Sequence, residues 1–172
     1  NEGDFVTVIG GNGAGKSTTL NAIAGVWPID SGKIYIGGDD VTKLSEHKRA
    51  KYLGRVFQDP MTGTATTMSI EENMAIAARR GEKRGLSWGI THQERDTYRE
   101  MLKALDLGLE DRLTSKVGLL SGGQRQAITL LMASIKKPKL LLLDEHTAAL
   151  DPKTAAKVLE ISDKIIAENH LT

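Results

Sequence analysis

Glycines, a lysine and two hydroxyl side chains stand close together near the N-terminus. Residues 10–18 read Gly10-Gly11-Asn12-Gly13-Ala14-Gly15-Lys16-Ser17-Thr18 and match the pattern G-x-x-x-x-G-K-[ST]. Glycines let backbone N–H groups point inward around a phosphate, because a Cβ atom would block the approach. Lys16 would supply a charge to the β- and γ-phosphates of a nucleotide, and Ser17 Oγ would bind Mg²⁺. The predicted binding residues are Asn12, Gly13, Ala14, Gly15, Lys16, Ser17 and Thr18.

Two carboxylates follow a run of leucines in the second half of the chain. Leu140 to Leu143 form a continuous apolar stretch, which is typical of a strand buried on both faces of a parallel sheet. Asp144 and Glu145 come next, at the end of the strand where α/β sheets place their ligands. Asp144 would hold Mg²⁺ through water, and Glu145 would polarise an attacking water. The alternative is a buried strand that simply has a polar end.

A third candidate site opens a predicted helix. Ser121 and Gln124 have the spacing of a capping box, and Gly122 and Gly123 between them bare the amides of the first turn. Such a helix N-terminus binds anions. One nucleotide does not need two such sites in one chain, so this second site would serve a nucleotide held by another copy. A plain helix cap is the alternative.

The elements around these residues alternate between strands and helices. The apolar run 5–9 is a predicted strand that leads into the glycine-rich loop, and Gly25 is expected to end the following helix with a positive φ. Capping boxes begin at Ser69 and Thr91, and Gly37-Gly38 predicts a tight hairpin turn. The other predicted strands are 33–36, 53–57 and 139–143, and the predicted helices are 16–24, 45–52, 122–136 and 152–169.

The amino-acid composition excludes several classes of protein. Lys plus Arg number 23 against 22 Asp plus Glu, a net charge of +1, which argues against a surface that coats nucleic acid. With no cysteine, the chain has no disulfide, thiolate metal site or cysteine nucleophile. The longest mostly apolar stretch, 127–135, is well below the roughly twenty residues of a membrane-spanning helix. The composition predicts a cytoplasmic globular protein without a signal peptide.

The combined motifs resemble the nucleotide-binding domain of ABC transporters. The resemblance rests on the glycine-rich loop, on the Ser-Gly-Gly-Gln helix start, on the apolar strand ending in Asp-Glu, and on Ala148-Ala149-Leu150-Asp151 after it. It covers essentially the whole chain. It also makes Phe57-Gln58-Asp59-Pro60 similar to the family's Q-loop, so that Gln58 would contact Mg²⁺ and the attacking water. Asp151 matches an aspartate that lies at the dimer interface in the family.

The resemblance implies an α/β fold with a P-loop NTPase core and a parallel sheet. Residues 1–63 and 119–172 would form this core, and residues 64–118 would form an inserted α-helical subdomain. Met74 and Trp88 could either line a groove for a partner's helix or lie in the core of that subdomain. The chain starts without Met and ends at Thr172, just past a helical pattern, which predicts a fragment truncated at both ends.

The implied function is ATP binding and hydrolysis that powers solute transport. Glu145 and Gln58 would be catalytic, and Ser17, Gln58 and Asp144 would bind Mg²⁺. The implied partners are a second copy in a head-to-tail dimer and a transmembrane permease, with no nucleic acid. The subunit would then lie on the inner face of the cell membrane. The alternatives are a soluble ABC-type ATPase of cofactor assembly, translation or DNA, and a nucleotide-gated binding module.

Three departures from the family pattern qualify the resemblance. His146 stands after Glu145, where the commonest pattern has proline, and this exchange is not expected to remove catalysis. The family's adenine-stacking aromatic would lie before Asn1 and its switch histidine beyond Thr172. His170 is expected to be a surface residue and not a substitute for the switch histidine. We therefore expect this chain alone to be a weak or inactive ATPase.

Overall fold

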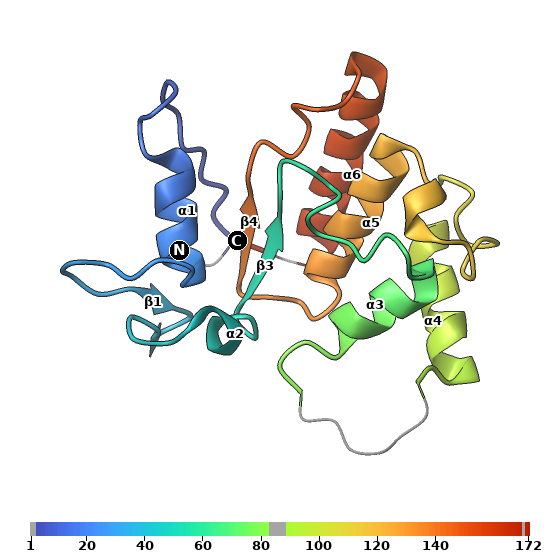
Figure 1. Cartoon of the computed structure of the whole chain (residues 1–172), viewed down its shortest axis with the longest axis horizontal. Coiled ribbons are helices and arrows are strands. Elements are labelled where there is room, and N and C mark those ends of the chain that lie inside the picture. Colours follow the sequence, from blue (N-terminus) through green and yellow to red (C-terminus); the bar gives the residue numbers. More distant parts are fainter. Residues whose placement is uncertain (1–2, 83–88, 170) are drawn as a thin grey trace.

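The structure is a computed structural model that describes residues 3–82, 89–169 and 171–172. Trp88 and His170 lie outside these residues. Figure 1 shows two strands in the middle of the molecule, with helix α1 on one side and helices α5 and α6 on the other. The elements are α1 (Lys16–Ala24), β1 (Tyr35–Ile36), β2 (Asp39–Asp40), α2 (Glu46–Arg49), β3 (Leu53–Val56), α3 (Ile70–Ala78), α4 (His92–Lys103), η1 (Val117–Leu119), α5 (Gly122–Ser134), β4 (Leu140–Leu143) and α6 (Pro152–Asn169).

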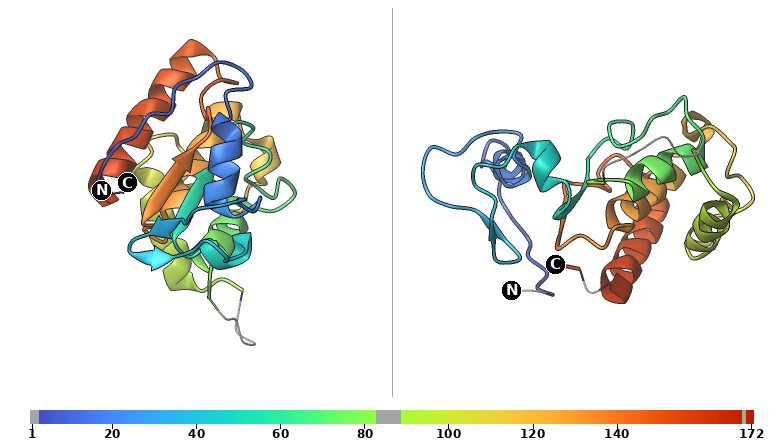
Figure 2. Two further views of the ribbon diagram at one scale, coloured as in Figure 1. Left: turned by 90° about the vertical axis from the view of Figure 1, so that its left-hand side faces the viewer. Right: turned by 90° about the horizontal axis from the view of Figure 1, so that it is seen from below.

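Strands β3 and β4 form a parallel pair that confirms the predicted α/β class. Leu53 pairs with Leu140 and Val56 with Leu143, and the Asp144 amide extends the pairing by donating to the Val56 carbonyl at 3.1 Å. The strands are apolar because helices cover them from two sides, as Figure 2 also shows. The Asp-Glu pair consequently emerges at the carboxyl end of β4.

The expected strand at residues 5–9 is wrong, because this segment pairs with no strand. The side chains of Phe5, Val6 and Ile9 are 73%, 75% and 90% exposed. The segment and β4 line a common groove of about 390 Å³, and the strand partner of β4 is β3. Thr172 links the two sides of this groove: its carbonyl accepts from the Leu141 amide at 2.7 Å, and its hydroxyl accepts from the Gly3 amide at 2.8 Å.

The hairpin of β1 and β2 confirms the predicted turn. Gly37 and Gly38 have φ angles of 58° and 86°, the conformation that a two-residue hairpin loop of type I′ requires. β1 is shorter than the expected strand 33–36, and α2 is shorter than the expected helix 45–52. Ser45 precedes α2 but makes no capping hydrogen bond, because its hydroxyl lies 3.2 Å from the ring of His47.

A buried arginine fixes the end of α1. The Arg49 side chain is 2% exposed and donates to the carbonyls of Ala22, Ile23, Thr42 and Leu44 at 2.7–2.9 Å. Burial lowers the pKa of Arg49. Gly25 ends α1 with φ 82°, as expected, and a Cβ there would come within 2.9 Å of Arg49 Nε. These contacts hold α1 in place at its C-terminal end, opposite the glycine-rich loop.

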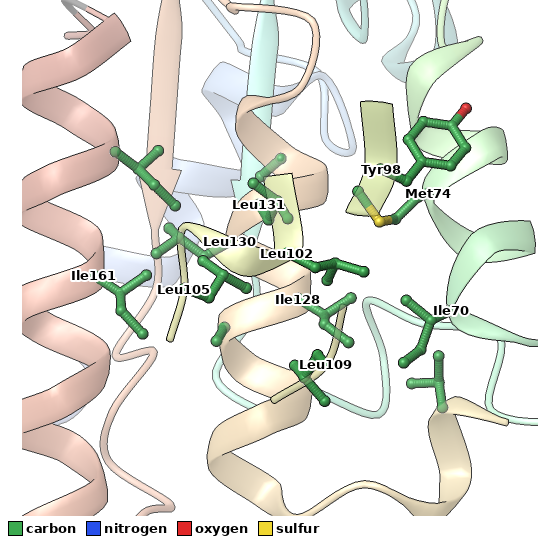
Figure 3. Packing of buried hydrophobic residues seen from close by; sticks show 14 of the residues in the cluster. Ile70, Met74, Tyr98, Leu102, Leu105, Leu109, Ile128, Leu130, Leu131 and Ile161 are labelled. Atoms are coloured by element: carbon green, nitrogen blue, oxygen red, sulfur yellow. The ribbon is translucent and has the colours of Figure 1, made fainter. Parts of the chain in front are cut away.

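One apolar cluster packs helices α3 and α4 against α5 and α6. Both predicted capping boxes are present, at Ser69 with Glu72 and at Thr91 with Glu94. Figure 3 shows Ile70 of α3 facing Ile128 of α5, and Met74 of α3 beside Tyr98 of α4. Met74 is fully buried and therefore belongs to the core. Within the described ranges, no helix is long and apolar enough to cross a bilayer.

Candidate functional site

The glycine-rich loop delivers the first turn of α1 without a side-chain cap. Gly13 and Gly15 have φ angles of 81° and 87°, which only glycine adopts readily, and Gly15 is the N-cap residue of α1. In the part of the chain that the structure describes, this helix start has no side-chain cap hydrogen bond. Ser17 and Thr18 follow and are exposed. The loop therefore presents free N–H groups and the positive end of the helix dipole, which are the requirements for binding phosphate.

Lys16 brings the loop and the end of β4 together. Its ammonium group donates to the Gly10 carbonyl at 2.8 Å and to the Gly11 carbonyl at 3.3 Å. The same Nζ atom lies 3.8 Å from Glu145 Oε1. Two motifs from opposite ends of the chain thus meet at one side chain, and Asp144 lines the same groove as Lys16 and Glu145.

Asp144 has a cationic neighbour that the motifs did not indicate. Arg55 on β3 has Nη2 3.9 Å from Asp144 Oδ2 and 2.7 Å from Asn21 Oδ1 of α1. Its guanidinium also lies 4.6 Å from the centre of the Phe57 ring. Arg55 therefore connects α1, β3 and the carboxylate after β4. The sequence carried a signal for it, an arginine within the otherwise apolar strand 53–56.

Glu145 and His146 occupy an unusual stretch of backbone. Glu145 has φ 44°, in the left-handed region that a residue with a Cβ rarely adopts. Its side chain is half exposed, whereas His146 is partly buried. His146 Nε2 lies 3.1 Å from Ser162 Oγ of α6, and burial lowers the pKa of His146.

Gln58 lies apart from this cluster. It is exposed, two residues past the end of β3, and in the described structure no hydrogen bond joins it to Lys16, Asp144 or Glu145. The loop around it is shaped by its neighbours: Asp59 Oδ1 accepts from the Met61 amide at 2.8 Å. Its assignment as a Mg²⁺ and water contact stays a prediction.

The helix start at Ser121 lies on the far side of the strand pair from the glycine-rich loop. Figure 1 shows α5 and α1 on opposite sides of β3 and β4. The capping box is present: Ser121 Oγ accepts from the Gln124 amide, and Gln124 Oε1 accepts from the Ser121 amide, both at 3.2 Å. A nucleotide on the glycine-rich loop is therefore out of reach of this chain's own Ser121.

One of the two glycines that follow Ser121 has a different role from the one expected. Gly122 is exposed, but Gly123 is buried, so it does not bare an amide to solvent. A Cβ on Gly123 would come within 2.1 Å of Thr154 Cγ2 on α6. Gly123 is therefore required for the close packing of α5 on α6.

Asp151 caps α6. Its Oδ1 accepts from the Thr154 amide at 3.1 Å, and hydrogen bonds from Thr154 lower the pKa of Asp151. Asp151 and Gly123 both meet Thr154, so the helix starts of α5 and α6 are neighbours. This pair of helix starts forms a second polar surface, separate from the loop of Lys16.

The donor set around Lys16 fits a nucleoside triphosphate with Mg²⁺. Uncapped amides and an ammonium group recognise an anion, while a serine hydroxyl and a carboxylate are ligands that a hard cation accepts. The cation would be held by Ser17, which follows Lys16 in the sequence, and by Asp144, which precedes Glu145.

Comparisons with known proteins agree with this geometry. The sequence profile described as "ABC transporter" matches residues 1–148. The chain belongs to the ABC transporter family. Among similar proteins are a tyrosine transport ATP-binding protein of Clostridioides difficile, 45% identical over 99% of this chain, and a phosphonates import ATP-binding protein of Rhodopseudomonas palustris, 33% identical over 98%. The chain spans 68% and 62% of these two relatives.

Solved structures give the same fold for ABC cassettes. The dimeric structure of a bacterial ABC transporter cassette has a TM-score of 0.79 and is 31% identical, covering 100% of this chain and 73% of that one. A dimeric post-hydrolysis cassette bound to ADP and phosphate has a TM-score of 0.78 and 30% identity, covering 99% and 72%. The chain is thus an ATPase cassette with the P-loop NTPase fold.

Proposed function

We propose that this ABC cassette binds ATP at the loop from Asn12 to Thr18 and hydrolyses it to drive solute import through a separate permease. The observation that carries the proposal is the position of Lys16. Its ammonium group lies among loop carbonyls at 2.8 and 3.3 Å and 3.8 Å from Glu145 Oε1. A phosphate-binding lysine and a carboxylate able to take a proton from water thus share one groove.

The residues of this groove divide the work. The amides of the loop and Lys16 would bind and orient the β- and γ-phosphates, and Ser17, Asp144 and Gln58 would hold Mg²⁺, which neutralises phosphate charge when bound. Arg55, 3.9 Å from Asp144, would orient that carboxylate. Glu145 would accept a proton from the attacking water at its carboxylate. Lys16 would leave Glu145 when phosphates compete for its ammonium.

A second copy of the chain would complete each site. Ser121 to Gln124 and Asp151 lie on the side of the strand pair away from Lys16, which supports their action on a nucleotide bound by the partner copy. The similar cassette structures are described as dimeric, which supports a head-to-tail dimer for this chain as well. Closure of the dimer would place the α5 helix start against the γ-phosphate.

The transport role rests on the relatives. Those named above act in tyrosine transport and phosphonates import, and this supports an import system with a membrane-spanning partner. The cassette would then lie on the cytoplasmic face of the membrane through that permease.

Co-purification tests the transport role directly. The full-length protein is expressed with the permease encoded beside it and purified from detergent-solubilised membranes by a tag on the permease. We expect the cassette to co-purify and its ATPase rate to change when the solute and its binding protein are added. A cassette that stays in the soluble fraction and hydrolyses ATP independently of the permease would contradict import and favour a soluble ATPase.

A further inference from the structure

The turn that carries Glu145 is anchored on both sides of that residue. Before it, the Asp144 amide donates to the Val56 carbonyl of β3 at 3.1 Å. After it, His146 Nε2 lies 3.1 Å from Ser162 Oγ, at the middle of α6. Glu145 itself has φ 44°, a conformation in which a residue with a Cβ persists only when its surroundings hold it. The contact of His146 with Ser162 restrains this turn, and it depends on the histidine that stands here in place of the family's commonest proline.

The direction of the hydrogen bond follows from proton counting. Ser162 Oγ lies 2.8 Å from the Val158 carbonyl one turn earlier, and a carbonyl can only accept, so the single hydroxyl proton of Ser162 points there. The hydroxyl oxygen is then left to accept from His146. His146 must therefore carry a proton on Nε2 and donate it to Ser162.

Ser162 is a firm anchor for this bond. Its side chain is 2% exposed, and α6 packs along α5 in the apolar cluster through Ile161 and Ile165. His146 lines the same groove as Lys16 and Glu145. A hydrogen bond from the groove to a buried helix position thus fixes the residue next to the carboxylate.

We propose that His146 is a positioning residue, whose Nε2–H bond to Ser162 on α6 holds Glu145 in the left-handed conformation that aims its carboxylate into the Lys16 groove. The proposal rests on the proposed role of Glu145 as the base. His146 touches neither nucleotide nor water in this role. Movement of α6 would be transmitted through His146 to the orientation of Glu145.

The test compares single and double variants of the full-length protein in steady-state ATP hydrolysis and Mg-ATP binding. His146→Ala and Ser162→Ala each remove one partner, and His146→Gln keeps an N–H donor at a similar reach. Ser134→Ala is the matched control, because Ser134 is also buried, donates to a carbonyl three residues earlier on α5, and has no histidine partner among its hydrogen bonds in the described structure.

We expect His146→Ala and Ser162→Ala each to lower kcat about tenfold with KM and ATP affinity nearly unchanged, since misaiming a catalytic group costs rate and not binding. A double variant that combines His146→Ala with Ser162→Ala should be no slower than either single one, and His146→Gln should keep much of the parent rate. Ser134→Ala should keep its kcat. Melting curves identify any variant that has lost its fold.

Glu145→Gln separates this proposal from the one on which it rests. In that background His146→Ala should cause no further loss, because its effect passes through Glu145. A near-normal rate for Glu145→Gln alone would overturn the assignment of the base. A slow Glu145→Gln combined with normal kcat in folded His146→Ala and Ser162→Ala would overturn the positioning role only. Equal losses in kcat and in ATP affinity would also overturn it.

Discussion

The helix starts of α1 and α5 are both proposed to meet the phosphates of a nucleotide, yet their first turns differ in how they are capped. Gly15 precedes α1 and caps no amide, so the first turn is open and Lys16 stands beside it. Ser121 precedes α5 and closes a capping box with Gln124, so part of its first turn is already satisfied. An open end with its own lysine can bind phosphate alone. A capped end without a lysine is better suited to complete a site that another copy has already loaded.

The largest effect should come from the carboxylate beside the open end. Glu145→Gln keeps the shape of the side chain but removes the base, so turnover should fall by about 10² or more while ATP stays bound. Steady-state phosphate release and equilibrium binding measure the two quantities. Glu46→Gln, an exposed acid in the first turn of α2, should match the parent protein. Loss of binding in step with turnover would show that Glu145 holds the nucleotide instead.

The lysine of the open end should govern affinity. Lys16→Ala removes the charge that faces the phosphates and should weaken Mg-ATP binding by about 1.5–3 kcal/mol, the worth of a charge-assisted hydrogen bond. Lys103→Ala, an exposed lysine in the last turn of α4, is the control and should bind normally. Titration calorimetry measures both. Unchanged Mg-ATP affinity in Lys16→Ala would show that the nucleotide does not bind at this loop.

Loss of the cap at the start of α5 should lower both folding stability and ATP turnover, and a second capped helix separates the two effects. Ser121→Ala and Ser69→Ala each break a capping box and should each cost about 0.5–2 kcal/mol of folding stability, seen as a lower melting temperature. Only Ser121→Ala should also slow ATP turnover at saturating ATP, because Ser69 heads a helix outside the site. Equal turnover in both variants would show that the Ser121 capping box stabilises the helix but takes no part in ATP hydrolysis.

Local patterns predicted this fold well where the determinants are local. The φ of Gly25, the hairpin at Gly37-Gly38 and the boxes at Ser69 and Thr91 depend on residues within one turn of each other, and each is present. The prediction of a strand at residues 5–9 was wrong, because an apolar run indicates only that a segment is able to pair with a strand. Whether a neighbouring strand lies close enough is decided by the rest of the chain, and β4 pairs with β3 and not with this segment.

The missed features of the site are long-range contacts. The motifs named Lys16, Asp144 and Glu145, but Arg55 joins Asp144 across the parallel pair, and Gly123 is small because Thr154 of another helix lies against it. His146 was expected only to replace a proline, and its partner Ser162 lies on α6. Such partners depend on how helices pack, which no spacing within one motif encodes.

Mixing two impaired variants of the full-length protein tests most directly whether the two helix ends act on one nucleotide from different copies. Lys16→Ala subunits are mixed with Ser121→Ala subunits, and phosphate release is compared with the two separate samples. If the ends act in trans, each mixed dimer holds one composite site with Lys16 and Ser121 both intact, so activity should rise clearly above the sum of the separate samples. No rise, with mixed dimers demonstrated by differently tagged subunits, would contradict the account.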